Sequence, residues 1–304
     1  MRIQINQQPL DFTLEGSETV GDVLRELTRW IEDNGEIVVE TCIDATDVSG
    51  GVPRELAALP AAEIGDIHIV SSSPLQYRLR RLTIMDNYMS LLEEAVLKGS
   101  LQTIQEITGE YPYIRSQLSD ELNNGQESGS SELDTIIQAI QMETQELQPE
   151  QRRSVAVIIQ MARTILQDRI REIMHPMPSL HGTVEQMQAL LPGIVEVSIQ
   201  LQTNNEKAAM QTVFQTSELL SKLLRILGII QERGDITHSL PLDKIQESHH
   251  NLISLLQELE SALAENDSVT VGDILEYEIA PVLEDVCSEI RANIPAAALT
   301  GDGA

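Results

Sequence analysis

Residues 205–232 constrain the fold of this chain more than any other segment. The polar residues of this segment that follow one another at spacings of four and three are Gln211, Gln215, Glu218, Lys222 and Arg225. On a helix with about 3.6 residues per turn these positions form one narrow polar seam, and most of the others are apolar. A surface helix carries a single apolar stripe, so a helix this widely apolar needs neighbours on several sides. We therefore predict that it is the central helix of a helical bundle.

Composition and charge limit the classes of partner. The chain has 304 residues, of which 41% are hydrophobic, so it has ample material for a folded core. The formal net charge of −28 opposes binding to nucleic acid and to anionic membranes, because both are negatively charged. Two interpretations of the acidity remain open, a solubilising surface and an acidic face for a basic partner. We expect no nucleic-acid partner and no membrane insertion.

The cysteines and the N-terminal residues indicate a compartment. Cys42 and Cys287 match neither a metal-ligand spacing nor a Cys-x-x-Cys redox motif, which is typical of structural thiols in a reducing environment. Residues 1–5 alternate apolar and polar side chains and lack the apolar core of a signal peptide. No apolar run reaches the length that spans a bilayer. We expect a soluble cytoplasmic protein without a cofactor.

The first 73 residues show the period of β-strands around one helix. Alternating apolar residues predict a hairpin, and they are Met1, Ile3, Ile5, Leu10, Phe12 and Leu14. A helix that opens at Ser17 or Thr19 carries apolar residues on one side, namely Val20, Val23, Leu24, Leu27, Trp30 and Ile31. Further strands are predicted over 37–43 and 67–70. Strand, strand, helix and further strands describe a β-grasp sheet wrapped on one helix.

A family resemblance follows from these residues. The resemblance rests on the opening hairpin together with four further segments. They are Thr19-Val20-Gly21-Asp22-Val23-Leu24, the turn Asp44-Ala45-Thr46-Asp47-Val48, Pro53-Arg54 and Ile64-Gly65-Asp66-Ile67-His68-Ile69-Val70. This pattern resembles the ubiquitin-like sulfur carriers of thiamine and molybdopterin synthesis. Those carriers end in a free Gly-Gly whose carboxylate is adenylated and thiolated. Here the corresponding place reads Ser71-Ser72-Ser73-Pro74 and the chain continues, while Gly50-Gly51 lies inside a loop. The resemblance therefore implies a small docking domain without carrier chemistry.

Past residue 73 the apolar spacing changes from two to between three and four, which indicates helices. The predicted fold class is α+β, a small N-terminal β-grasp domain followed by a mainly α-helical domain of αα-hairpins that form a helical bundle. The predicted segments are a β-grasp domain over 1–73, a first helical hairpin over 74–122, a flexible linker over 123–131, the bundle over 132–294 and a frayed tail over 295–304. In the first hairpin, one unbroken helix is expected from Leu101 to Leu118.

Two Glu-x-x-His matches, Glu172…His175 and Glu247…His250, are the strongest catalytic candidates. Di-iron bundles use this spacing twice, because side chains at i and i+3 converge on one metal. However, Glu247 and His250 fall on the polar side of their helix, and His175 precedes Pro176 at a helix end. The interpretation we favour is that these are solvated residues; the alternative is a metal site. No glycine-rich phosphate loop or nucleophile elbow accompanies them.

Two other groups of residues are candidates for partner binding. Arg152, Arg153 and Arg163 gather with other arginines on one predicted helix. Intramolecular pairing with carboxylates is the simpler interpretation, and binding of an acidic partner surface or self-association is the alternative. For Glu276, Tyr277 and Glu278 the interpretation we favour is a solvated face of the two carboxylates beside a half-buried Tyr277 ring, and the alternative is an exposed recognition patch.

These observations lead to two hypotheses. In the first, the chain is a non-enzymatic interaction protein, an adaptor, scaffold or chaperone, that binds another protein, and homo-oligomerisation is left open beside it. Through residues 273–283 the whole chain resembles uncharacterised bacterial proteins associated with motility gene sets, which implies a motility role but no activity. In the second, the chain is a metal-dependent helical enzyme that uses Glu172, His175, Glu247 and His250.

Overall fold

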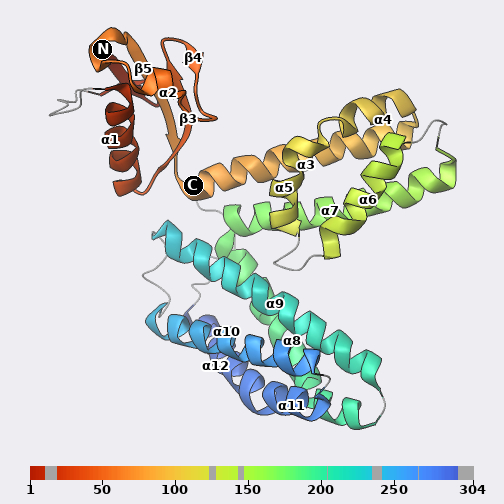
Figure 1. Cartoon of the computed structure of the whole chain (residues 1–304). Helices are drawn as coiled ribbons and strands as arrows, with labels where there is room; N and C mark the ends of the chain where they lie inside the picture. Colours follow the sequence, from red (N-terminus) through yellow and green to blue (C-terminus); the bar gives the residue numbers. More distant parts are fainter. Residues whose placement is uncertain are drawn as a thin grey trace. The chain divides into compact units, whose positions relative to one another are not determined.

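The computed structural model describes residues 1–10, 19–122, 128–142, 147–203, 205–234, 242–265 and 267–293. For residues 120, 128–132 and 242–250 it describes the backbone alone. The chain divides into two compact units, Met1–Ile84 and Met85–Ala304. Figure 1 labels their helices and strands. The fold is a small N-terminal mixed sheet with helices, followed by a mainly helical part with packed helix pairs, as the sequence predicts.

The N-terminal unit is built on a five-stranded sheet. Its strands are β1 (Arg2–Ile5), β2 (Gln8–Pro9), β3 (Ile37–Ile43), β4 (Thr46–Asp47) and β5 (Asp66–Ser72). Their order in the sheet is β2-β1-β5-β3-β4. The central pair, β1 and β5, is parallel, and the other neighbouring strands are antiparallel. A parallel pair needs a long crossover, and the segment that contains the unit's main helix supplies it.

Two tight turns set the ends of this sheet. Asn6 and Gln7, between β1 and β2, have φ of 52° and 67°, and Asp44 and Ala45, between β3 and β4, have φ of 45° and 66°. Left-handed backbone at two consecutive residues matches the right-handed twist of a hairpin. The Asp44 carboxylate also accepts hydrogen bonds from the backbone N–H groups of Gly65 at 3.0 Å and Asp66 at 2.8 Å. The turn is thereby attached to the start of β5.

Helix α1 (Val20–Asp33) supplies the other half of this unit's core. Thr19 is its N-cap, with the hydroxyl oxygen accepting from the Asp22 N–H at 3.3 Å. The buried residues that α1 and the sheet share include Val20, Val23, Leu27, Ile31, Ile3, Ile43, Ile67 and Ile69. Of the predicted apolar side, Trp30 is exposed. Phe12, Leu14 and Ser17 lie outside the described residues. Two short helices, α2 (Arg54–Ala57) and η1 (Ala61–Glu63), precede β5.

Helices make up the remainder of the described chain. They are α3 (Pro74–Lys98), α4 (Leu101–Thr108), α5 (Tyr111–Leu122), α6 (Ser128–Met142), α7 (Pro149–Met174), α8 (Pro176–Gln202), α9 (Glu206–Arg233), α10 (Leu242–Ala264), α11 (Ser268–Asp273), the π-helix η3 (Ile274–Ile279) and α12 (Ala280–Asn293). Contacts join α8 to α9, α11 and α12, and join α10 to α11 and η3. Less extensive packing contacts join α5 and α6 to α7. The predicted packing of helix pairs is confirmed.

Two details differ from the predicted helices. The helix expected from Leu101 to Leu118 is divided into α4 and α5, because Pro112 lacks an N–H and its ring clashes with the carbonyl four residues earlier. Helix α6 begins at Ser128, inside the segment predicted as a linker over 123–131. Small polar residues such as Ser and Gly are well accepted where a helix starts. Residues 123–127 and the predicted frayed tail, 295–304, lie outside the described residues.

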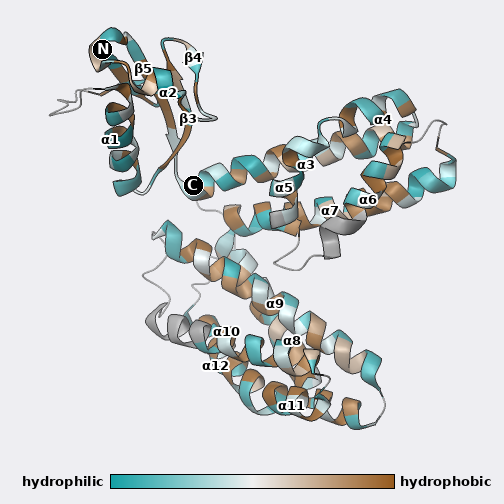
Figure 2. Cartoon of the chain, in the orientation of Figure 1, coloured by the Kyte–Doolittle hydropathy of each residue, from teal (hydrophilic) through white to brown (hydrophobic). Residues whose placement is uncertain are grey.

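Helix α9 has the predicted neighbours but not the predicted uniform burial. It contacts α7, α8 and α10. The buried residues of its C-terminal half are Leu220, Leu223, Ile226, Leu227, Ile229 and Ile230. In the N-terminal half, however, Met210 and Phe214 are exposed, so this part is amphipathic. Figure 2 shows brown and teal residues alternating along the same helices, as expected for helices with one solvated face.

Truncation of a buried α9 side chain tests this packing. Leu223 is almost fully buried, and we expect Leu223→Ala to lower the free energy of unfolding of the helical unit by about 2–5 kcal/mol through lost burial and a cavity. Met210→Ala, at an exposed site on the same helix, is the matched control and is expected to change it by less than about 0.5 kcal/mol. Urea denaturation followed by circular dichroism measures both. Equal effects of the two changes would contradict the described burial.

Candidate functional site

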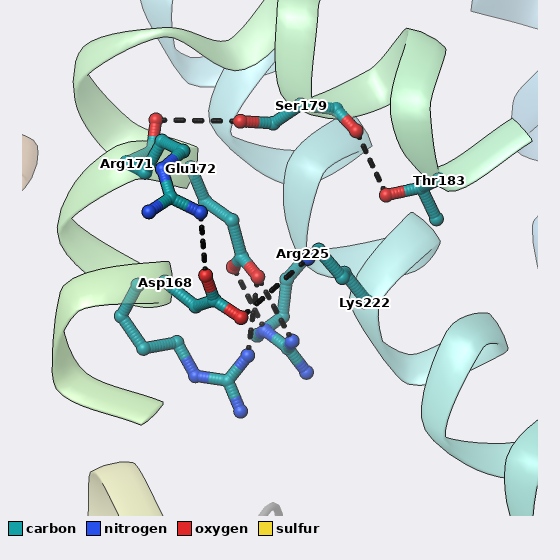
Figure 3. A network of polar contacts seen from close by, with 8 residues as sticks. Asp168, Arg171, Glu172, Ser179, Thr183, Lys222 and Arg225 are labelled. Atoms are coloured by element: carbon teal, nitrogen blue, oxygen red, sulfur yellow. Dashed lines mark hydrogen bonds and ion pairs between the residues drawn. The ribbon is translucent and has the colours of Figure 1, made fainter. Parts of the chain in front are cut away.

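A buried ion cluster joins α7 to α9. Glu172 on α7 is only 2% exposed, and both of its carboxylate oxygens accept hydrogen bonds. Arg225 on α9 donates from Nε to Oε2 and from Nη2 to Oε1, each at 3.2 Å. Arg169, one turn earlier on α7, donates from Nη1 to Oε1 at 3.3 Å. Figure 3 shows the carboxylate of Glu172 directed at the guanidinium group of Arg225.

Further polar contacts surround this cluster. Asp168 accepts from Arg171 Nη1 at 2.8 Å and lies 3.9 Å from Lys222 Nζ on α9. At the end of α7, Arg233 donates from Nη2 to the carbonyl oxygen of Ile173 at 2.8 Å. The cationic side chains of α9 therefore meet the C-terminal end of α7, where the helix dipole and the last carbonyl groups favour positive charge.

The chemistry of the cluster is structural. A carboxylate between two guanidinium groups is neutralised and its lone pairs are used, which leaves little affinity for a metal cation. The predicted partner of Glu172, His175, is exposed at the junction between α7 and α8. The structure therefore does not bring these two side chains together as a metal site. The side chains of Glu247 and His250, on α10, lie outside the described residues.

Among the side chains that the structure describes, no group of three or more His, Cys, Asp and Glu residues has an arrangement that holds a metal ion. The described helices also include none that is both long enough and apolar enough to cross a bilayer.

The predicted arginine group is dispersed over three environments. Arg163 makes ion pairs with Asp86 at 3.1 Å and Glu93 at 2.5 Å. Both interactions raise the pKa of its guanidinium, and the hydrogen bond to Glu93 has the larger effect. Arg152 donates from Nε to the carbonyl oxygen of Leu147 at 2.7 Å and lies against Gly99, whose φ is +82°. Arg153 is exposed. Intramolecular pairing thus accounts for Arg163, whereas Arg153 remains on the surface.

The predicted Glu276-Tyr277-Glu278 patch lies on the π-helix η3. Tyr277 is 67% exposed, so its ring is not half buried as we expected, and Glu278 is exposed beside it. A hydrogen bond with Glu276 raises the pKa of the Tyr277 hydroxyl. The wider turn of a π-helix shifts side chains relative to an α-helix, and such turns are frequent at functional sites. The sequence contains no clear signal for the π-helix.

An apolar groove between α8 and α9 is the feature that sequence reasoning missed. Its volume is about 390 Å³, and its lining residues are Gln186, Ala189, Leu190, Phe214, Gln215, Glu218 and Leu219. Phe214 is 59% exposed there. The available signal was the position of Phe214 next to Gln215 and four residues before Glu218, at the margin of the polar seam. A second hollow, between α10 and α11, is larger at about 540 Å³ but is lined mainly by hydroxyl and carboxylate groups.

Comparisons with known proteins match two parts of the chain. Residues 179–289 match a family described as "Domain of unknown function (DUF8042)", and residues 1–73 match the "TP0873 N-terminal domain". The first match contains the α8/α9 groove and the π-helix, and the second covers the sheet domain. No match to a solved structure was found.

A curated relative is similarly without an assigned activity. An uncharacterized protein of Treponema pallidum (strain Nichols) is 31% identical over 97 residues, which cover 31% of this chain and 48% of that protein. The chain therefore spans about half the length of the curated relative that it matches. This similarity links part of the chain to a bacterial protein.

Removal of the buried carboxylate tests the ion cluster. We expect Glu172→Ala to lower the free energy of unfolding by about 3–5 kcal/mol, because Arg169 and Arg225 would be left as unpaired charges in a buried site. The control is Asp168→Ala, which removes a more exposed pair and is expected to cost less than about 1 kcal/mol. Urea denaturation measures both, and a Glu172→Ala protein as stable as the control would refute the proposed role.

Proposed function

We propose that this chain is a non-enzymatic protein-interaction module, an adaptor, scaffold or chaperone, whose α8/α9 groove takes an amphipathic helix of another protein. The observation that carries the proposal is the exposure of Phe214 beside Leu190 and Leu219 in a groove between two packed helices. Grooves of this kind commonly bind the apolar face of a partner helix. A large aromatic ring exposed in such a groove is a typical anchor for that face.

The chemistry of the groove suggests the chemistry of its partner. Its lining includes the apolar residues Ala189, Leu190 and Leu219, while Gln186, Gln215 and Glu218 supply hydrogen-bonding groups. The net charge of the chain, −28, attracts cationic partners over a distance of about one Debye length. The partner that fits best is therefore an amphipathic helix with an apolar stripe and lysine or arginine on its other face.

The N-terminal sheet domain supports the same class of function. Its strand order, β2-β1-β5-β3-β4 with β1 and β5 parallel and α1 packed on the sheet, is the arrangement expected of a ubiquitin-like β-grasp domain. In the sulfur carriers the last strand leads to the reactive terminus. Here β5 ends at Ser72 and α3 begins at Pro74. A domain of this kind without the reactive terminus retains its use as a docking surface.

The association with bacterial motility is the more specific part of the proposal. It rests on the resemblance carried by residues 273–283, a segment that places Tyr277 and Glu278 on the surface. Exposed tyrosine beside carboxylates is suited to a cationic partner, because the ring face and the carboxylates both attract positive charge. The patch and the groove thus favour the same kind of partner.

Photo-crosslinking in cells that make the protein tests the proposal. A benzophenone amino acid in place of Phe214 is expected to yield one dominant adduct whose peptide is an amphipathic, lysine- or arginine-rich helix. Phe214→Ala is expected to weaken the complex with the partner so identified by about tenfold or more, as for an aromatic anchor. The control position is Tyr113 on α5, which is 82% exposed and distant in sequence from the groove. The same adducts from both positions, or none from position 214, would contradict the proposal.

A further inference from the structure

Helix α7 exposes three apolar side chains in line, next to the C-terminal part of the helix where α9 packs. Val157, Met161 and Ile165 follow one another at intervals of four residues, so they lie on one side of the helix. They are 55%, 63% and 36% exposed. The opposite side of α7 is buried through Ile159, Leu166 and Ile173. An isolated exposed apolar residue is ordinary, but three in line on one helix are typical of an interface.

The charges at the two ends of this apolar surface follow the same order along the helix, negative and then positive. Glu150 and Arg153 precede it on the same side of the helix, and Asp168 and Arg171 follow it. Glu150, Arg153 and Arg171 are exposed, and the Asp168 side chain is 40% exposed. From the N-terminal end the sequence of signs is therefore negative, positive, apolar, negative, positive. We call this line of residues the α7 stripe.

This arrangement is complementary to a reversed copy of itself. If two α7 helices lie antiparallel with Met161 opposite Met161, Val157 faces Ile165 and the charges meet in pairs of opposite sign. Arg153 then faces Asp168 of the second copy, and Glu150 faces Arg171. A parallel pair would instead place each charge opposite its own like charge. The carboxylate of Asp168 can accept this partner in addition to Arg171 and Lys222 of its own chain, because it has several lone pairs and is 40% exposed.

We propose that the α7 stripe is the interface of an antiparallel, two-fold symmetric homodimer. The local charge of α7 permits such contact although the chain as a whole carries −28, because this helix contains five arginines and three carboxylates. The stripe from Glu150 to Arg171 is about 32 Å long. Two such helices bury on the order of 1,000 Å² in total, at the low end for specific complexes, so micromolar dissociation constants are expected.

The α7 stripe is separate from the α8/α9 groove, so the dimer does not depend on the proposed function. Residues 179–289, which match the uncharacterised family, also do not include α7. Loss of dimerisation in a stripe variant and loss of partner binding in a Phe214 variant are therefore distinguishable results. A hetero-partner on the stripe is the competing occupant, and it predicts a monomer for the purified chain.

Analytical ultracentrifugation of the full chain tests the existence of the dimer. From about 1 to about 200 µM the mass is expected to rise from 33.7 kDa toward twice that value. Met161→Glu, which places two carboxylates face to face, is expected to weaken the dimer by about 100-fold or more. Met210→Glu, at an exposed methionine on α9, should leave it unchanged. A monomer at all concentrations, or equal effects of the two variants, would overturn the proposal.

Disulfide crosslinking tests the register. In a Cys42→Ser background, in which the remaining Cys287 is buried, Met161→Cys is expected to form a linked dimer under mild oxidation, whereas Tyr113→Cys is not. A mixture of Val157→Cys and Ile165→Cys chains is expected to give linked heterodimers in excess over dimers of either chain alone. Preferential 157–157 and 165–165 links would show a parallel pair and overturn the antiparallel arrangement.

Discussion

The buried carboxylate of Glu172 is the constraint on which the arrangement of the helical unit depends. A charge with 2% exposure is tolerated only when opposite charges pair with it, and here Arg169 and Arg225 supply them. Because Arg225 lies on α9 and Glu172 near the end of α7, the pairing fixes the position of α9 along the axis of α7. Any slip by one turn would leave buried charges unpaired, at a cost of several kcal/mol. Apolar contacts in the same core are far less selective for register.

This fixed register determines where the two exposed apolar surfaces lie. Helix α8 follows α7 directly and packs along α9, so the position of α9 also sets the α8/α9 groove that contains Phe214. Glu172 follows Ile165 by seven residues and Met161 by eleven, so it lies on the same side of α7 as these apolar residues. Helix α9 packs against this side at Glu172, and Val157, Met161 and Ile165 remain exposed nearer the N-terminus of α7. The buried charges thus fix how the helices pack. The exposed surfaces of the packed helices are the parts suited to binding.

Local patterns were predictable from the sequence, and long-range pairings were not. Thr19 as a cap, the buried side of α1 and the start of α3 after Ser73 follow from residues a few positions apart. Glu172 and Arg225 are 53 residues apart, and the sequence assigned one to a Glu-x-x-His match and the other to a polar seam. The segment 205–232 was expected to have neighbours on several sides, yet Phe214 is exposed, because periodicity does not reveal where a neighbouring helix ends. The π-helix at 274–279 depends on one extra residue per turn, which no residue type marks.

On the proposed function, the acidic side chains of this chain support and shape surfaces and hold no reactive metal. The most direct test is the metal content of the purified full-length protein, measured by inductively coupled plasma mass spectrometry for the wild type and for His250→Ala. Since Glu172 is already neutralised by two arginines, we expect far less than one iron or manganese per chain, with no difference between the two proteins. One tightly bound iron or manganese per chain, lost in His250→Ala, would contradict the account.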